Sequence, residues 1–327
     1  MSKLILRGIE NVELSICIPA YNRVDTLKEA IDSVLNLQQN GIIYNCIISE
    51  DNSKNHKAIY ELITSYNDVR IIYYFNETPL GMAENWNNCL KLAKSKYAAL
   101  LHDDDYLYDD YLYTVRKIWE LDIKFDIMYF AHDVQIYDRI EQNNYTGAKK
   151  IYKENQQDKL RRMTSGDYYF GACDTYYVPT CGCLYKREEI LKMGGYRKKD
   201  GFSADEILGE IISRKKKAYF YNHVVAVYRY TDTNLSQDIR VKRKFVEEGV
   251  YHRYEMGDNM LRYKILNKIF GKGFYIVLSG RWYERLVPDK VATNLEKILA
   301  KIFNVFRRIY IYMEEDLVFV VVKKYRH

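Results

Sequence analysis

A short apolar run leads directly into three adjacent carboxylates in the stretch Lys96-Tyr-Ala-Ala-Leu-Leu-His-Asp-Asp-Asp-Tyr-Leu107. The run at 97–101 predicts a buried strand, and His102 with the three aspartates follows where that strand would leave its sheet. In a parallel α/β sheet, ligands bind outside the carboxyl ends of the strands, where carboxylates suit Mg²⁺ or Mn²⁺. The alternative is an acidic, solvated helix start, because Asp109 and Asp110 follow and acidic residues favour helix N-termini.

The residues before this stretch alternate between strand and helix patterns. Apolar runs at 14–19, 44–49 and 69–75 predict strands, and apolar residues at helical spacing predict helices at 25–35, 59–66 and 86–93. This alternation predicts an α/β fold with a mostly parallel central sheet, right-handed crossovers and flanking helices.

Polar residues follow three of the predicted strands at the point where each strand ends. They are Tyr21-Asn22-Arg23, Glu50-Asp51 and the acidic residues after Leu101. Because parallel strands end at the same edge of a sheet, these groups are expected to converge on one crevice. Neither Gly-x-Gly-x-x-Gly after the first strand nor a Walker A loop is present, so a metal on carboxylates is the expected phosphate clamp.

The second half of the chain carries weaker patterns. Helices are expected at 112–119, 187–193 and 207–212, and strands at 126–132, 181–185 and 218–227. The polar stretch 137–165 has no clear period and is expected to be an excursion that covers the site. The expected division is a domain at 1–238, with a nucleotide-binding half at 1–105 and an acceptor half at 106–238, and a mainly helical C-terminal region at 239–327.

The C-terminal region is basic, with 19 Lys and Arg against 10 Asp and Glu over residues 240–327, whereas the first 239 residues carry a net charge of −3. A polyanionic partner such as an anionic membrane surface is therefore expected, and no recognisable motif predicts nucleic-acid binding. An apolar helical stripe from Leu295 to Ile309 favours core packing over a membrane interface. No signal peptide and no apolar run of about 18 residues are visible, so we expect a cytoplasmic protein. The basic C-terminal region adds the expectation that the protein associates with the inner face of the cell membrane.

Five motifs resemble, in order and spacing, those of the family 2 glycosyltransferases of the GT-A fold. They are Ser15-Ile-Cys-Ile-Pro-Ala-Tyr-Asn-Arg23, Ile48-Ser-Glu-Asp-Asn-Ser53, Gly81 with Asn85, His102-Asp-Asp-Asp105 and Ala204-Asp205. The resemblance covers roughly residues 14–236. It implies an enzyme that transfers a sugar from a nucleotide diphosphate donor, expected to be a UDP-sugar, to a hydroxyl of a glycan or lipid-linked acceptor in polysaccharide biosynthesis.

The resemblance also implies which residues hold the nucleotide sugar. These are Pro19, Ala20, Tyr21, Asn22, Arg23, Glu50, Asp51, Gly81, Asn85 and Asp103. Within this set Asp51 is expected to contact the uracil and Asp103 the ribose. Arg229, in the family's closing segment, is expected to hold phosphate charge through its guanidinium.

Asp104 matches the metal-binding second acid of the family's Asp-x-Asp motif, which implies Mn²⁺ or Mg²⁺. The first acid is replaced by His102, which we do not assign as a ligand. Thr231 stands where many members of the family have a histidine that contacts the metal or the diphosphate. The chain therefore departs from the family's pattern at two positions.

Asp205 matches the acid that serves as general base in inverting members of the family. A carboxylate at a helix start facing the anomeric carbon takes the proton of the acceptor hydroxyl as the new bond forms. Two alternatives stay open: Glu206 as the base, or a helix-start acid without a chemical role. The alternative for the whole chain is a nucleotide-sugar-binding protein without turnover, and a phosphohydrolase built on His102 and Asp103 is disfavoured.

Overall fold

An 11-stranded mixed sheet runs through the protein in the computed structural model, which describes residues 2–230 except 137–138, 142–159 and 170–179, together with scattered residues between 238 and 309. The strand order is β1 (Ser2–Leu6), β4 (Ile71–Asn76), β3 (Tyr44–Glu50), β2 (Leu14–Ala20), β5 (Tyr97–Leu100), β10 (Cys183–Lys186), β7 (Ile127–Ile136), β11 (Ala218–Tyr230) and β6 (Tyr106–Leu107). Two short strands lie off this path, β8 (Arg139–Glu141) beside β7 and β9 (Leu160–Met163) beside β11.

The parallel part of the sheet is formed by β4, β3, β2 and β5, as the alternating pattern predicts. Ile16 of β2 pairs with Cys46 of β3 on one side and with Ala99 of β5 on the other. Every residue of β2 and β3 is buried, which explains their continuous apolar runs. The sequence analysis did not predict β1, whose mixed polarity fits an antiparallel edge strand.

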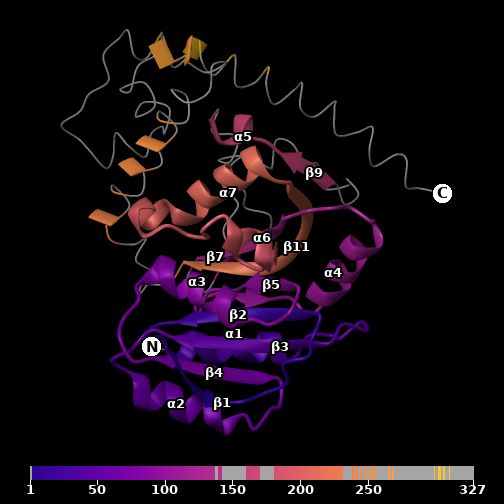
Figure 1. The fold of residues 1–327 in the computed structure, drawn as a ribbon, viewed down its shortest axis with the longest axis vertical. Helices are drawn as coiled ribbons and strands as arrows, with labels where there is room; N and C mark the ends of the chain where they lie inside the picture. Colours follow the sequence, from indigo (N-terminus) through magenta and orange to yellow (C-terminus); the bar gives the residue numbers. More distant parts are fainter. Residues whose placement is uncertain are drawn as a thin grey trace.

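Helices cover both faces of the sheet (Figure 1). One apolar core receives side chains from α1 (Asp25–Leu35), α2 (His56–Ser65) and α4 (Tyr111–Glu120). The other receives side chains from α3 (Met82–Leu92), α6 (Arg187–Lys192) and α7 (Ala204–Lys215). The 3-10 helix η3 (Lys198–Ser203) leads into α7, and the short helix α5 (Ser165–Tyr169) follows β9.

The second half of the chain extends the same sheet. Strand β10 enters antiparallel between β5 and β7, and β11 then pairs parallel with β7. The two halves are therefore continuous, and β5 has a neighbouring strand from each, β2 and β10. Of the polar excursion at 137–165, β8, β9 and the start of α5 are described, and most of the remainder lies outside the described residues.

The C-terminal region at 239–327 lies largely outside the described residues, so its expected helical character is not tested as a whole. Among the scattered described positions, Ile298, Ile302 and Ile309 are helical with about half of each side chain exposed. For the part of the chain that is described, no helix combines the length and apolarity needed to cross a membrane.

Candidate active site

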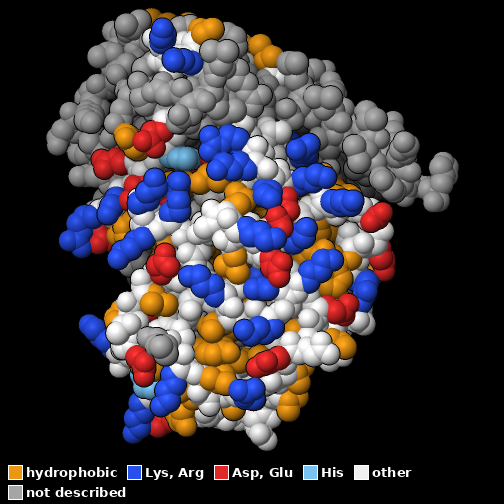
Figure 2. Space-filling view, in the orientation of Figure 1, with side chains coloured by type: hydrophobic (Ala, Val, Ile, Leu, Met, Phe, Trp, Pro, Cys, Tyr) orange, Lys and Arg blue, Asp and Glu red, His pale blue; other side chains and the backbone are white. Residues whose placement is uncertain are grey.

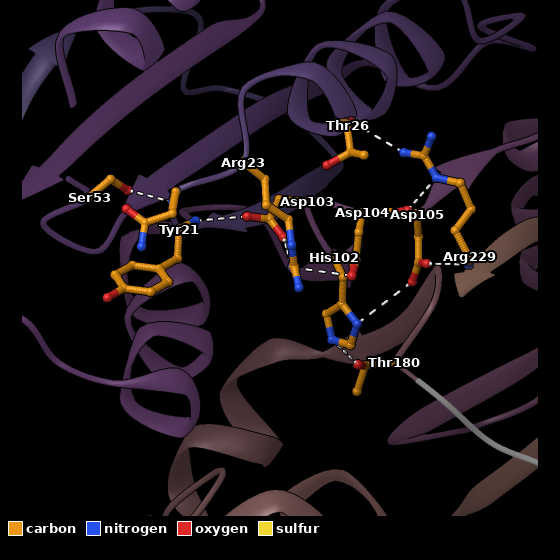
Figure 3. Close-up of polar contacts among 11 residues, drawn as sticks. Tyr21, Arg23, Thr26, Ser53, His102, Asp103, Asp104, Asp105, Thr180 and Arg229 are labelled. Carbon is orange, nitrogen blue, oxygen red and sulfur yellow. Dashed lines mark hydrogen bonds and ion pairs between the residues drawn. The ribbon is translucent and has the colours of Figure 1, made fainter. Parts of the chain in front are cut away.

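The acidic segment His102–Asp105 leaves the sheet directly after β5 and turns back on itself, because the Asp105 N–H donates to the His102 carbonyl at 3.2 Å. All three aspartates are buried. Asp103 accepts a hydrogen bond from the backbone N–H of Tyr21 at 2.7 Å and another from Arg23 Nη1 at 2.7 Å (Figure 3). The ends of β2 and β5 therefore meet at Asp103, as the parallel arrangement predicts.

Arg23 is the counterion of this segment. Its Nη1 lies 2.7 Å from Asp103 Oδ1 and 3.2 Å from Asp104 Oδ2. Burial raises the pKa of Asp103 to about 6, an effect that Arg23 opposes and the Asp104 charge reinforces. The residual negative charge of the segment suits a further cation.

A candidate metal site consists of His102, Asp104 and Asp105, whose potential ligand atoms all lie within 4.8 Å of one another. An imidazole nitrogen with carboxylate oxygens is a donor set that Mn²⁺ accepts, while Mg²⁺ prefers the oxygens. Burial raises the pKa of Asp105 well above its usual range, and the neighbouring Asp104 charge adds to the shift. The residues present therefore fit a divalent cation, and the set includes His102, to which the sequence analysis gave no ligand role.

His102 is held in a defined orientation. Its Nε2 hydrogen-bonds the Thr180 hydroxyl, and its Nδ1 lies 3.7 Å from Asp105 Oδ2. The imidazole stacks on the Trp86 indole with 5.0 Å between ring centroids. Burial lowers the pKa of His102 and so favours the neutral ring, the form that binds metal.

Arg229 lies on β11 and supports the acidic segment from a distant part of the chain. Its backbone N–H donates to Asp105 Oδ1 at 2.9 Å, and its guanidinium donates to the Asp104 carbonyl, the Glu29 carboxylate and the Thr26 carbonyl. The guanidinium is buried and directed at protein oxygens, and its expected contact with phosphate stays a prediction.

The turn after β2 presents one exposed aromatic side chain. Pro19 and Ala20 are buried in the strand, whereas the Tyr21 side chain is 50% exposed. Asn22 has a left-handed backbone with φ 64°, donates its N–H to the Ser53 hydroxyl and accepts the Lys54 N–H on its side chain. The turn is thereby tied to the loop after β3.

Asp51 holds the loop that starts α3. Its carboxylate accepts the backbone N–H groups of Leu80 at 2.7 Å and of Gly81 at 2.8 Å. Gly81 has φ 83°, and a Cβ at that position would meet no atom within 4 Å. The backbone conformation, not crowding, therefore favours glycine there.

Glu50 and Asn85 lie deeper than expected. Glu50 is fully buried and contacts His56 Nδ1 at 2.9 Å and the Tyr73 hydroxyl, while Asn85 donates to the Ser49 carbonyl at 3.0 Å. The expected contact of these two side chains with the nucleotide stays a prediction. They stabilise the strand ends on which Asp51 and Gly81 depend.

Asp205 lies in the first turn of α7, and its Oδ1 accepts the Glu206 N–H at 2.8 Å. Burial raises the pKa of Asp205 to about 7, with a smaller contribution from the Glu206 charge. An aromatic series connects this helix with the acidic segment: Tyr196 packs edge-on against Trp86, which stacks on His102. Burial and, more weakly, the Asp205 charge raise the pKa of Tyr196.

Several of these residues were missed by the sequence analysis. Three residues outside the recognised motifs contact site residues: Glu29 contacts Arg229, and Trp86 and Thr180 contact His102. Each contact joins residues that are distant in the sequence. Thr231 lies outside the described residues, so its replacement of the expected histidine has no structural account.

Comparison with solved structures shows the same fold. The chain superimposes on the crystal structure of Staphylococcus aureus TarS 1-349 in complex with UDP-GlcNAc with a TM-score of 0.54, at 12% identity and over 90% of this chain and 89% of that one. It superimposes on the mannosyltransferase PcManGT from Pyrobaculum calidifontis, in complex with GDP-Man and Mn²⁺, with a TM-score of 0.53, at 12% identity over 95% and 86% of the two chains. These likenesses show a GT-A fold.

Sequence comparison adds relatives and a family. The Escherichia coli UDP-Glc:alpha-D-GlcNAc-diphosphoundecaprenol beta-1,3-glucosyltransferase WfaP is 37% identical over 93 residues, 28% of this chain and 36% of that protein. In other relatives, the match to this chain covers between 22% and 72% of the relative's own length. The model of Glycosyl transferase family 2 matches residues 15–188, more than half of the sequence. The chain belongs to glycosyl transferase family 2.

Proposed function

We propose that the protein is an inverting, metal-dependent glycosyltransferase that moves a sugar from a UDP-sugar to a hydroxyl of a glycan or lipid-linked acceptor. The observation that carries the proposal is the meeting of Tyr21, Arg23 and the acidic segment at the ends of β2 and β5. Family membership supports it, as do the nucleotide sugars in the titles of the TarS and PcManGT structures.

The nucleotide would lie across the ends of the parallel strands. The exposed Tyr21 ring offers a stacking surface for a base, and Asp51 offers a carboxylate at the edge of the same crevice. Asp103 is proposed to contact the ribose. WfaP is named for a UDP-Glc donor, which favours uracil as the base in this chain as well.

The metal is proposed to bind Asp104 together with His102 and Asp105. When bound, Mn²⁺ or Mg²⁺ would neutralise charge on the diphosphate and make it a better leaving group. Arg23 would release Asp104 to the cation and remain paired with Asp103. Arg229 keeps the acidic segment in place through the Asp104 carbonyl.

Asp205 is proposed as the general base. Its carboxylate would take the proton of the acceptor hydroxyl while that oxygen attacks the anomeric carbon from the face opposite the diphosphate, which inverts the configuration. A pKa of about 7 matches this task, because the group is then a stronger base than an ordinary carboxylate and still partly ionised at neutral pH.

A cytoplasmic location on an anionic membrane surface is the proposed setting. Positive charge gathers in residues 240–327, and Lys198, Lys199 and the exposed members of the run 214–217 add to it on the described surface. Figure 2 shows Lys and Arg side chains spread over the face in view, with Asp and Glu side chains among them. Flotation with anionic vesicles, but not with neutral ones, is expected at low salt and should be lost at high salt.

The catalytic proposal is tested by measuring UDP release from a panel of UDP-sugars with Mn²⁺. Wild-type protein should release UDP, and Asp205→Asn should bind UDP normally while losing release by at least about 100-fold. Binding of UDP-sugars without any release, with or without acceptor glycans, would instead identify a nucleotide-sugar-binding protein without turnover.

A further inference from the structure

Three residues of the C-terminal region lie against η3 and α7. Lys244, Glu248 and His252 recur at every fourth position, and each is helical, so they share one face of their helical segment. Lys244 and Glu248 also form an ion pair at 3.9 Å. This face meets the chain directly before and within the helix that carries Asp205.

Glu248 makes the central contact. Its Oε2 accepts the backbone N–H of Phe202 at 2.8 Å and that of Ser203 at 3.3 Å. These N–H groups lie three and two positions before Asp205, at the entry to α7. The first N–H groups of a helix lack intrahelical acceptors, and a carboxylate there is favourable to both hydrogen bonding and the helix dipole.

Gly201 shows how closely this carboxylate approaches the backbone. A Cβ at Gly201 would lie 2.1 Å from Glu248 Oε1 and 2.6 Å from its Oε2, closer than real contacts allow. Gly201 also has φ 59°, a conformation that favours glycine. The backbone conformation therefore favours glycine, and a side chain at position 201 would displace the Glu248 carboxylate from its present place.

The contact continues on both sides of Glu248. Lys244 Nζ lies 5.6 Å from the centroid of the Phe202 ring, and His252 Nε2 lies 3.2 Å from Glu210 Oε2 on α7. Glu210 is buried one and a half turns after Asp205 on the same helix. The C-terminal segment thus fixes α7 at its entry and along its length.

We infer that Glu248 is a positioning residue for Asp205, so that the C-terminal region completes the catalytic half of the enzyme. The inference rests on the proposed role of Asp205 as general base. Loss of the Glu248 carboxylate would free the Phe202 and Ser203 N–H groups and let the first turn of α7 move. A base displaced by about 1 Å loses much of its effect, whereas the nucleotide pocket on β2 and β5 stays intact.

The test uses full-length Glu248→Ala with two companions. Glu247→Ala is the matched control, because Glu247 is the adjacent glutamate and is exposed. Glu248→Gln is the conservative variant, because its amide oxygen still accepts both N–H groups. UDP binding with Mn²⁺, the kcat of UDP release from UDP-glucose and UDP-N-acetylglucosamine, and hydrogen exchange over residues 201–206 are measured for each.

Glu248→Ala should lower kcat about tenfold, raise hydrogen exchange over residues 201–206 and leave the Kd for UDP unchanged, with partial recovery in Glu248→Gln and no change in Glu247→Ala. Wild-type kcat in Glu248→Ala, with Asp205→Asn inactive, would overturn this inference alone. Retained turnover in Asp205→Asn would overturn the proposed base and, with it, the role given to Glu248. An equal loss of kcat in Glu247→Ala would mean that general destabilisation explains the loss, and it would overturn the inference as well.

Discussion

The three adjacent aspartates have the same chemistry but different surroundings. Asp103 is occupied by the Tyr21 N–H and Arg23, and Asp105 by the Arg229 N–H. Among the described residues, the Asp104 carboxylate has one ion pair, the longer contact to Arg23 at 3.2 Å, and it shares a candidate metal site with His102. Substitutions in this segment should therefore have unequal effects.

Asp104→Ala is expected to weaken Mn²⁺-dependent UDP binding by about 100-fold, because Asp104 is the proposed carboxylate ligand of the cation. Calorimetry with UDP, with and without Mn²⁺, measures this. Asp109→Ala is the control, since Asp109 is a nearby exposed carboxylate that contacts Gln38. Unchanged Mn²⁺-dependent binding in Asp104→Ala would remove Asp104 from the metal site.

The activity should depend on the ionisation of Asp205. Because a base acts in its deprotonated form, kcat should rise with pH and level off above the Asp205 pKa of about 7. A profile of kcat between pH 5 and pH 9 tests this, with Glu206→Gln as the comparison. If Glu206→Gln abolishes the rise and Asp205→Asn keeps it, Glu206 is the base.

Ionisation of Asp205 should raise kcat but lower the free energy of unfolding as the pH rises. The pKa of Asp205 is higher in the folded protein than in the unfolded chain, so its stabilising contribution is present at low pH and is lost as pH rises from about 4 to about 7. Asp205→Asn should therefore raise the free energy of unfolding by about 1–2 kcal/mol at pH 8 and by little at pH 4. Equal effects at both pH values, measured by denaturant unfolding, would contradict a raised pKa at Asp205.

At the scale of single elements, the start of α3 depends on the backbone of Gly81. Gly81→Ala places an L side chain at φ 83° and should cost about 1 kcal/mol of stability. Because the Gly81 N–H is held by Asp51 at the crevice, UDP affinity should also fall, by about tenfold. Thermal unfolding and UDP calorimetry separate the two effects.

Gly194→Ala is the matched control for this prediction. Gly194 also has a positive φ, 90°, and open space around its Cβ position, but it follows α6 and not the crevice. It should lose similar stability and keep full UDP affinity. A similar loss of affinity in both variants would mean that general destabilisation, not the loop at Asp51, explains the effect.

The sequence predicts the elements better than it predicts their contacts. Strand periodicity and the polar residues at strand ends predict that Tyr21, Asp51 and Asp103 lie at one edge of the sheet, because parallel strands end on the same side. Side-chain depth is not predictable in this way: Glu50 and Asp51 are neighbours, yet Glu50 points into the core and Asp51 into the loop. Successive side chains along a strand point to opposite faces of the sheet. The sequence alone does not show that helices cover both faces, so it does not predict how deeply each side chain is buried.

Contacts between distant elements carry no local signal. Arg229 pairs with Glu29, and Glu248 pairs with the Phe202 N–H. The sequence around each of these residues indicates only a strand end or a helix face and does not indicate the partner. The stacking of His102 on Trp86 likewise depends on how α3 packs against the sheet. These contacts decide how the site is held, and only the three-dimensional structure reveals them.

At the scale of the whole molecule, Arg229 connects α1, the acidic segment and β11. Arg229→Ala should reduce the free energy of unfolding by about 2 kcal/mol, because it removes a buried side chain and leaves the Asp104 carbonyl without this donor. Arg116→Ala is the control, since Arg116 also donates to backbone carbonyls, those of Asn40 and Gly41, but at the surface. Comparable losses in the two variants, measured in urea, would contradict the special position of Arg229.

The contact between Arg229 and Glu29 spans 200 positions of sequence. Closing so long a loop is entropically costly, and contacts of this range generally form late in folding. A nascent chain that has emerged only as far as β6 already contains His102 and all three aspartates, yet it lacks the strand that orders them. If the acidic segment binds the proposed cation, affinity for that cation should appear only after β11 has joined the sheet.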